Sequence, residues 1–299
     1  MCTLTPSPKI KIQMNNKKTA LILCNIATLL LGTTGLFGRW VSISSIGITF
    51  FRVLVSSVAL FVFCKINKQD ISMKSKGDRW AFLCAGVLLA IHWITFMESV
   101  KLSNVAICTI TFATFPLFLT FLEPLVFKTK LTKINILLAA LIVVGISITA
   151  WGTEMGSGNF MGFVMGFASA ISYAFLQLFN KSFTKKQYNG TVISMYEQGV
   201  VAIVLLPVIL ITKIQPTAQD LIFLLALGLL CTAIAHTTLI SAMKTLPAQV
   251  VGICNSMETV YSIALAAILL GENPTVNEVI GAIIVTAVVI TAQTREATR

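Results

Sequence analysis

Glu258 is the residue whose type and position most clearly point to chemistry, because it lies deep within an apolar segment. It stands about ten residues after the start of the apolar run at 248–271. At 1.5 Å per helical residue, the carboxyl group lies about 15 Å from the membrane surface, in the middle of a hydrocarbon core of about 30 Å. Ionisable groups at that depth are costly and usually functional. Glu258 is therefore predicted to bind a substrate amine or to carry a coupling proton.

Polar neighbours extend this predicted substrate site along the same segment. Asn255, Glu258 and Ser262 follow one another at steps of three and four residues, so they share one face of a helix. Tyr261 lies beside them. The site is predicted to include all four side chains.

Further candidates lie in other apolar segments. Arg52 lies within the segment at 46–64, where an unpaired arginine costs about 2.5–3.5 kcal/mol, and Glu197 occupies the matching position in the segment at 192–212. These two side chains either stabilise each other or backbone carbonyls, or they take part in the site. His92 and Trp93 are candidates in the segment at 79–97, although His92 and His236 are also typical of hydrogen bonds between helices.

Two other segments each carry a face of polar and small residues. These faces, together with the one around Glu258, predict a central aqueous path lined by Asn25, Gly32, Ser169, Tyr173, Asn255 and Ser262. Gly162 and Gly166 form a G-x-x-x-G pattern that allows close helix contact. This pattern favours packing within one chain over a dimer interface, so a monomer or a weak dimer is expected.

The sequence offers little for catalysis, cofactors or metals. It contains no Walker-type phosphate loop, and its seven cysteines contain no C-x-x-C pair. The three aspartates, Asp70, Asp78 and Asp220, lie in loops or at a segment edge, which excludes a paired-aspartate intramembrane protease. No catalytic residue, metal site or cofactor is predicted, and an intramembrane enzyme remains a minor alternative.

The elements that position these residues must be transmembrane helices. Of 299 residues, 56% are hydrophobic and 11% are charged, and the mean hydropathy is +0.89. About ten apolar runs approach the ~20 residues that a spanning helix requires. These runs are at 19–39, 46–64, 79–97, 105–127, 134–151, 160–181, 192–212, 220–240, 248–271 and 275–293. The expected fold is an all-α polytopic membrane protein with ten transmembrane helices.

An internal repeat divides these ten helices into two halves. At an offset of 143 residues, Lys101 matches Lys244, Thr132 matches Thr275, and each copy shows the same alternation of polar turns and apolar runs. Five is an odd number, so the second half is predicted to be inverted in the membrane. The predicted organisation is a basic tail at 1–18, five-helix repeats at 19–151 and 160–293, a connecting loop at 152–159 and a C-terminal tail at 294–299.

The charge distribution predicts the topology. With the N-terminus inside, 18 lysines and arginines lie in inward loops and tails and three lie outside, as the positive-inside rule expects. Both termini and the 65–79 loop are therefore predicted to face the cytoplasm, with the protein in the cytoplasmic membrane. The first apolar run is interpreted as an uncleaved helix. The net charge of +11 thus reflects topology, and no nucleic-acid partner is expected.

The segment from Glu258-Thr-Val-Tyr261 to Leu269-Leu-Gly-Glu272 resembles the ending of the EamA family in the drug/metabolite transporter superfamily. Phe115-Pro116 and Ala242-Met-Lys244 are similar to other recurring pieces of that family. Thr259 departs from the common proline, and Phe127-Lys-Thr replaces a possible Leu-Gly-Glu. The resemblance covers nearly the whole chain and implies alternating-access export or exchange of small metabolites such as amino acids.

A secondary transporter is thus the predicted function, with a small-molecule substrate, membrane lipid as surroundings and protons as a candidate coupling ion. A channel or an accessory membrane subunit is the other alternative. Substrate identity and transport direction do not follow from the residues.

Overall fold

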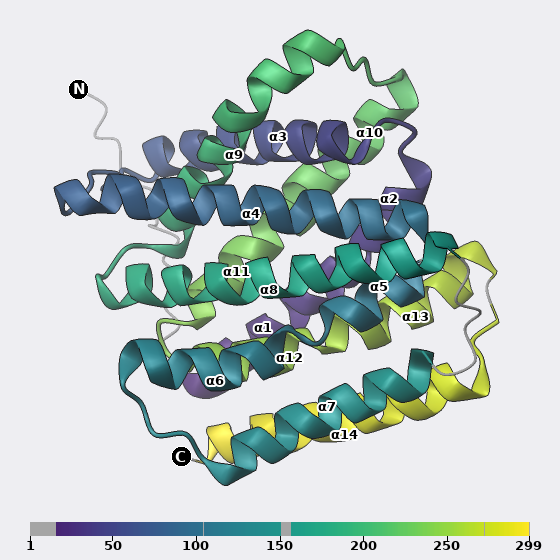
Figure 1. The fold of residues 1–299 in the computed structure, drawn as a ribbon. Helices are drawn as coiled ribbons and strands as arrows, with labels where there is room; N and C mark the ends of the chain where they lie inside the picture. The colour runs from purple at the N-terminus through teal and green to yellow at the C-terminus, as the bar shows by residue number, and fades with distance from the viewer. Residues whose placement is uncertain (1–15, 104, 151–156, 272, 299) are drawn as a thin grey trace, which may run out of the picture.

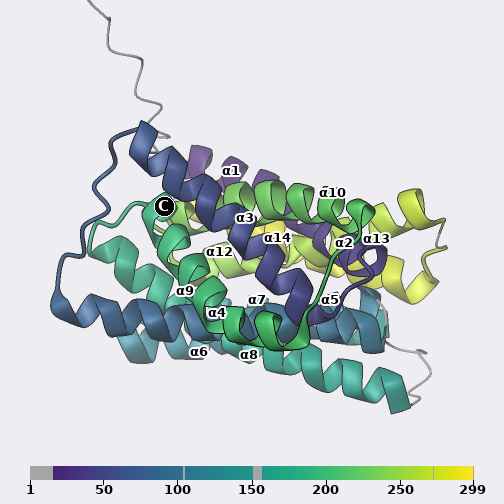
Figure 2. The same cartoon turned by 90° about the horizontal axis from the view of Figure 1, so that it is seen from above.

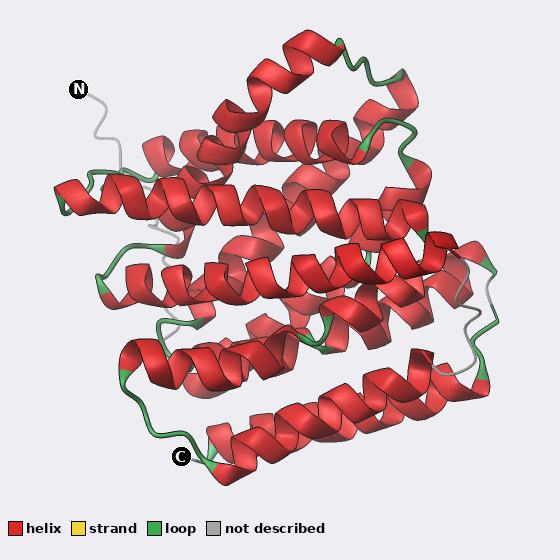
Figure 3. Cartoon of the chain, in the orientation of Figure 1, coloured by secondary structure: helices red, strands yellow, loops and turns green. Residues whose placement is uncertain are grey.

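A computed structural model describes residues 16–103, 105–150, 157–271 and 273–298, and all regular structure in these ranges is helical (Figures 1 and 3). The helices are α1 (Lys17–Gly32), α2 (Thr34–Trp40), α3 (Ser45–Ile66), α4 (Lys76–Leu102), α5 (Val105–Phe112), α6 (Phe115–Phe127), α7 (Lys133–Ala150), α8 (Ser157–Lys185), α9 (Gly190–Thr212), α10 (Ala218–Ala226), the π-helix η1 (Leu227–His236), α11 (Thr237–Ala242), α12 (Ala248–Asn255), α13 (Met257–Leu270) and α14 (Val276–Ala297). Most of the predicted N-terminal tail, most of the 152–159 loop and Glu272 lie outside the described residues.

Eight stretches among the described residues are long and apolar enough to cross a membrane, and two shorter apolar helices, Phe115–Phe127 and Lys133–Ile148, accompany them. Large apolar side chains on these helices remain exposed, with Leu125 at 76% and Ile211 at 80%. Such surfaces are stable in lipid, because a helix satisfies its own backbone hydrogen bonds. The chain is a multi-pass membrane protein, while the count of ten spans stays a prediction.

Helices of one half pack against helices of the other half in a matching pattern. Helix α3 packs on α9, and α7 packs on α14 (Figures 1 and 2). Helix α8 packs against α4, α5 and α6 of the first half, and α1 packs correspondingly against η1, α11, α12 and α13 of the second. The lead helix of each half therefore lies against the third and fourth helical segments of the other half.

Small residues make the closest of these contacts possible. A Cβ atom on Gly166 of α8 would clash with the Thr111 hydroxyl, and one on Gly162 would clash with the Ser103 hydroxyl. The Ser99 hydroxyl also donates a hydrogen bond to the Gly162 carbonyl at 2.6 Å. The G-x-x-x-G face is thus occupied by α4 and α5 of the same chain.

Four helices are irregular near the middle of the molecule. Thr33 separates α1 from α2, and its hydroxyl donates to the Leu30 carbonyl at 2.7 Å, a local bond that competes with the helical ladder. Residues 113–114 separate α5 from α6, where Pro116 stands in the first turn of the new helix and supplies no backbone donor. Ser256 separates α12 from α13 without a proline. The fourth irregularity is the π-helical segment η1.

Candidate functional site

These irregular segments surround a small cavity of about 20 Å³, which has room for about one water molecule. Its lining combines one arginine, one glutamate and two histidines with hydroxyl, amide, aromatic and aliphatic groups. The lining residues are Leu31, Thr34, Arg52, His92, Trp93, Phe96, Phe112, Tyr173, His236, Asn255 and Glu258.

Breaks in the helices bring different backbone segments to this one point. Leu31 and Thr34 lie on either side of the break at Thr33, and Asn255 and Glu258 lie on either side of Ser256. His236 closes the π-helix. Single π-turns and discontinuous membrane helices are common where a site needs helix geometry to change. The backbone irregularities therefore mark the same place as the polar side chains.

Arg52 is held at the cavity by one end of its guanidinium group. Its Nε donates to the Thr232 hydroxyl at 2.8 Å, and its Cζ lies 4.3 Å from the centre of the Trp93 ring. The side chain is fully buried, and neither terminal nitrogen has a hydrogen-bond partner among the described residues. A guanidinium with its two terminal nitrogens free presents a flat fork that matches a carboxylate.

Glu258 is 5% exposed and lines the same cavity from α13. The Asn255 amide donates to its Oε2 at 3.3 Å, and the Thr28 hydroxyl donates to the Asn255 Oδ1 at 3.4 Å. No ion pair joins Glu258 to Arg52 in the described structure. The two opposite charges thus share one cavity without contacting each other.

An aromatic wall closes another side of the cavity. The ring centres of His92 and Tyr173 lie 4.5 Å apart, and His92 stacks on Phe112 at 5.0 Å. The His92 Nδ1 is hydrogen-bonded to the Ser169 hydroxyl at 2.7 Å, which fixes the orientation of the imidazole. This wall provides apolar contact surface beside the charged groups.

Six of the ten predicted site residues line the cavity: Arg52, His92, Trp93, Tyr173, Asn255 and Glu258. The other four lie elsewhere. The amides of Asn25 and Gln293 hydrogen-bond each other at 3.0 and 3.1 Å, and the Ser262 hydroxyl donates to the Gly32 carbonyl at 2.8 Å. Tyr261 packs in a second apolar cluster with α7 and α14. Glu197 on α9 is fully buried, and its carboxyl oxygens have no hydrogen-bond partner among the described residues.

Several lining residues were not predicted. Thr34, Phe96 and Phe112 have no sequence feature that separates them from ordinary apolar-segment residues, because only the packing of their helices decides which face meets the cavity. For His236, the sequence favours a hydrogen bond between helices over a place in the site. Both of its ring nitrogens are buried and lack described partners, and its ring lies 5.5 Å from Trp93.

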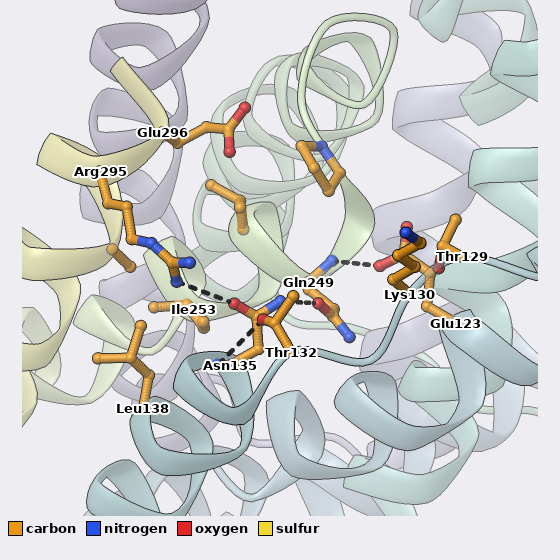
Figure 4. A pocket seen from close by; sticks show the side chains of 13 residues that line it. Glu123, Thr129, Lys130, Thr132, Asn135, Leu138, Gln249, Ile253, Arg295 and Glu296 are labelled. Atoms are coloured by element: carbon orange, nitrogen blue, oxygen red, sulfur yellow. Dashed lines mark hydrogen bonds between the residues drawn. The ribbon is translucent and has the colours of Figure 1, made fainter. Parts of the chain in front are cut away.

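A larger pocket of about 180 Å³ lies near the ends of α6, α7, α12 and α14 (Figure 4). Here the Glu123 carboxylate accepts from the backbone N–H groups of Ala248 and Gln249 at 3.2 and 2.8 Å, and so caps the start of α12. The Asn135 amide donates to the Gln249 Oε1 at 2.6 Å and accepts from Arg295 at 3.5 Å. Several polar groups of this pocket therefore form hydrogen bonds between the two halves.

The cavity brings a guanidinium, a carboxyl group and two imidazoles together. Among the described residues, no group of three or more His, Cys, Asp and Glu side chains is arranged to hold a metal ion. The fold is that of a multi-pass membrane protein with charged and polar side chains gathered around one small cavity.

Comparison with known proteins identifies the protein family. A family model of the EamA-like transporter family matches residues 18–151 and again residues 160–292. The chain belongs to the EamA-like transporter family and is a membrane transporter. It is 22% identical over 285 residues to the "Uncharacterized transporter YxxF" of Bacillus subtilis (strain 168), covering 92% of this chain and 90% of that protein. A solved crystal structure, 14% identical, superposes with a TM-score of 0.76 over 92% of this chain and 96% of the other, which shows a shared fold.

Proposed function

We propose that this transporter moves a small metabolite, an amino acid or a related compound, across the cytoplasmic membrane by alternating access, as an exporter or exchanger. The observation that carries the proposal is the small cavity that Arg52 of the first half and Glu258 of the second half line together. Both side chains are buried at membrane depth, a placement that is costly and usually serves transport.

Alternating access explains why the cavity is so small. A volume of about 20 Å³ does not admit a metabolite, so the surrounding helices must separate before a solute enters. Breaks at Thr33, residues 113–114 and Ser256 divide three lining helices into shorter pieces that can move separately. Motion of one half against the other, around a fixed site, is the general behaviour of repeat-built transporters.

Within this proposal, Glu258 is the principal charged group. It either binds the ammonium group of the substrate or carries a proton that is coupled to transport. The amide of its partner Asn255 is placed to keep the carboxyl group oriented within the cavity. The two roles predict different effects of the same substitution.

The deciding test is uptake of a labelled metabolite mixture, including amino acids, into proteoliposomes, with and without a pH gradient. We expect substrate counterflow and saturable uptake by the wild-type protein. Glu258→Gln should abolish pH-driven net transport and keep counterflow if Glu258 carries the proton. It should weaken substrate affinity, most for aminated substrates, if Glu258 binds the ammonium group.

Glu98→Gln, outside the cavity lining, is the matched control and should leave both activities unchanged. Ion conductance without saturation would instead indicate a channel. A Glu258→Gln protein with the affinity, rate and pH profile of the wild type would remove Glu258 from the mechanism.

A further inference from the structure

We infer that the pocket of about 180 Å³ shown in Figure 4 binds a phosphate group, supplied by the headgroup of an anionic phospholipid. This pocket shares no lining residue with the central cavity, and the inference holds whichever solute the protein carries. The ends of α6, α7, α12 and α14 and the α6–α7 loop line it, so both halves contribute. Its volume has room for several water molecules, and therefore for a tetrahedral oxyanion.

The two carboxylates of this pocket already have partners. Glu123 accepts the two backbone hydrogen bonds at the start of α12, where the helix dipole favours a negative charge. The Glu296 carboxylate forms an ion pair with Lys17 of α1, with 2.9 Å between Oε1 and Nζ. Neither carboxylate therefore leaves a strong uncompensated negative charge in the pocket.

The two cations of the pocket, Lys130 and Arg295, are less well compensated. Neither forms an ion pair with a carboxylate among the described residues. Arg295 makes one long contact, from Nη1 to the Asn135 Oδ1 at 3.5 Å, so N–H groups of its planar fork stay available in the described structure. A phosphate accepts such N–H groups in pairs.

Hydrogen-bonding side chains lie between these two cations. Thr132 and Gln249 stand between Arg295 and Lys130 in the view of Figure 4. The hydroxyl groups of Thr132 and Thr129, which also line the pocket, add donors for phosphate oxygens. Lys130 is exposed, and its flexible side chain can turn toward an anion bound beside Arg295.

The position of the pocket favours a lipid as the source of the phosphate. Helix α6 ends at Phe127 and α7 begins at Lys133, so the loop between them lies where two apolar helices end. Leu125, Val126 and Leu131 are exposed in this segment and offer contact surface for acyl chains. The loop is predicted to face the cytoplasm, where anionic lipids create a negative surface potential that attracts lysine and arginine.

A phosphate held in this pocket would join the two halves of the protein. Lys130 and Thr132 belong to the first half, and Arg295 belongs to the second. The hydrogen bond of 2.6 Å from Asn135 to Gln249 already joins the halves at this place. Because a ligand that binds the folded state and not the unfolded chain stabilises the folded state by mass action, bound lipid is expected to raise thermal stability.

The test measures lipid binding to the purified full-length protein in detergent. Phosphatidylglycerol is compared with phosphatidylcholine of the same acyl chains, in which a choline cation compensates the same phosphate, and with soluble glycerol 3-phosphate and inorganic phosphate. Native mass spectrometry measures retained lipid, and thermal unfolding measures the shift in midpoint. We expect phosphatidylglycerol to bind at least about tenfold more tightly than phosphatidylcholine and to raise the midpoint by about 4 °C at saturation. This comparison needs no variant and remains informative if a substitution prevents folding.

Three variants that each remove one positive charge locate the site. Arg295→Gln should weaken phosphatidylglycerol binding at least about tenfold, and Lys130→Gln should weaken it about threefold, since both remove a charge-assisted hydrogen bond. Lys133→Gln lies beside the same basic loop but outside the pocket lining, so it is the matched control and should bind as the wild type does.

Equal binding of the two lipids, or an equal loss of binding in all three variants, would overturn the assignment of the pocket, because the general charge of the loop would then account for the binding. Equal stabilisation by glycerol 3-phosphate and phosphatidylglycerol at the same concentration would overturn the lipid as the source and assign the phosphate site to a soluble ligand.

Discussion

At the scale of single residues, polar groups inside this protein serve two different purposes. Some of these groups form hydrogen bonds between helices, as Asn25 does with Gln293. Others, such as the terminal nitrogens of Arg52 and the oxygens of Glu197, are buried without described partners. A buried group without a partner lowers stability, so the free terminal nitrogens of Arg52 at the cavity support the proposed binding role. Glu197 lies outside the cavity lining, and its function stays a prediction.

The amide pair gives a direct test of a structural role. Asn25→Ala and Gln293→Ala should each lower thermal stability, with a coupling energy near 0.6 kcal/mol and below about 1.7 kcal/mol, as for hydrogen bonds between membrane helices. A double-mutant cycle followed by thermal unfolding in detergent measures this coupling. Substrate affinity should stay unchanged. A selective loss of affinity in Asn25→Ala would instead return Asn25 to the substrate path.

At the scale of helices, two aspartates at equivalent positions fasten opposite halves together. Asp78 lies in the first turn of α4 and Asp220 in the first turn of α10, 142 residues later. Each forms part of the capping box of its helix. Asp78 accepts from Lys186 at 2.5 Å and from the Tyr188 hydroxyl at 2.7 Å in the second half. Asp220 accepts from the Ser42 backbone and hydroxyl at 2.7 and 2.8 Å in the first half.

Both contacts are made in the described state. Tyr188 lies outside the spanning helices, and burial raises the pKa of its hydroxyl, so it remains a donor near neutral pH. Each capping aspartate therefore joins the start of a third helical segment to the turn before the second segment of the other half. The predicted inverted topology places these contacts on opposite membrane sides.

We predict that each contact holds one side of the transporter closed. Asp220→Asn should raise, several-fold, the rate at which a Thr34→Cys reporter in a cysteine-free background reacts with a thiol reagent added outside. Asp78→Asn should raise the rate for reagent added inside. Asp70→Asn is the control, since Asp70 is exposed and, among the described residues, its carboxylate accepts hydrogen bonds only from Ser72 of its own loop. If both variants left the labelling rate unchanged, the Asp78 and Asp220 contacts would only stabilise the fold.

At the scale of the whole molecule, exposed apolar side chains and a basic excess define how the protein lies in the membrane. The described helices expose aliphatic groups to lipid and bury polar ones around the cavity. The positive-inside rule then sets the direction of insertion. The loops containing Gln69 and Gln215 should therefore lie on opposite sides.

Single cysteines at these two positions test the topology. Gln69→Cys should be labelled by an impermeant thiol reagent only after the membrane is permeabilised, and Gln215→Cys should be labelled in intact cells. The physical reason is the five cations predicted for the 65–79 loop against the single Lys213 near Gln215. Labelling of both from outside would contradict the predicted orientation.

Membership in the EamA-like family was predicted from Glu258-Thr-Val-Tyr261 and Leu269-Leu-Gly and is confirmed by the family match. The helical class followed from composition, since only helices satisfy so much apolar backbone in lipid. The ten-span count, the inverted arrangement and the domain boundaries stay predictions.

Sequence alone determined that the chain lies in a membrane and that Glu258 and Arg52 are buried charges, because both follow from local composition. Tertiary structure alone decided that these two share one cavity, that Asn25 pairs with Gln293, and that Phe112 and Thr34 face the site. The physical reason is that helical periodicity gives the faces of each helix separately. Which faces meet depends on packing between segments far apart in the chain and on the breaks that rotate one part of a helix against the next.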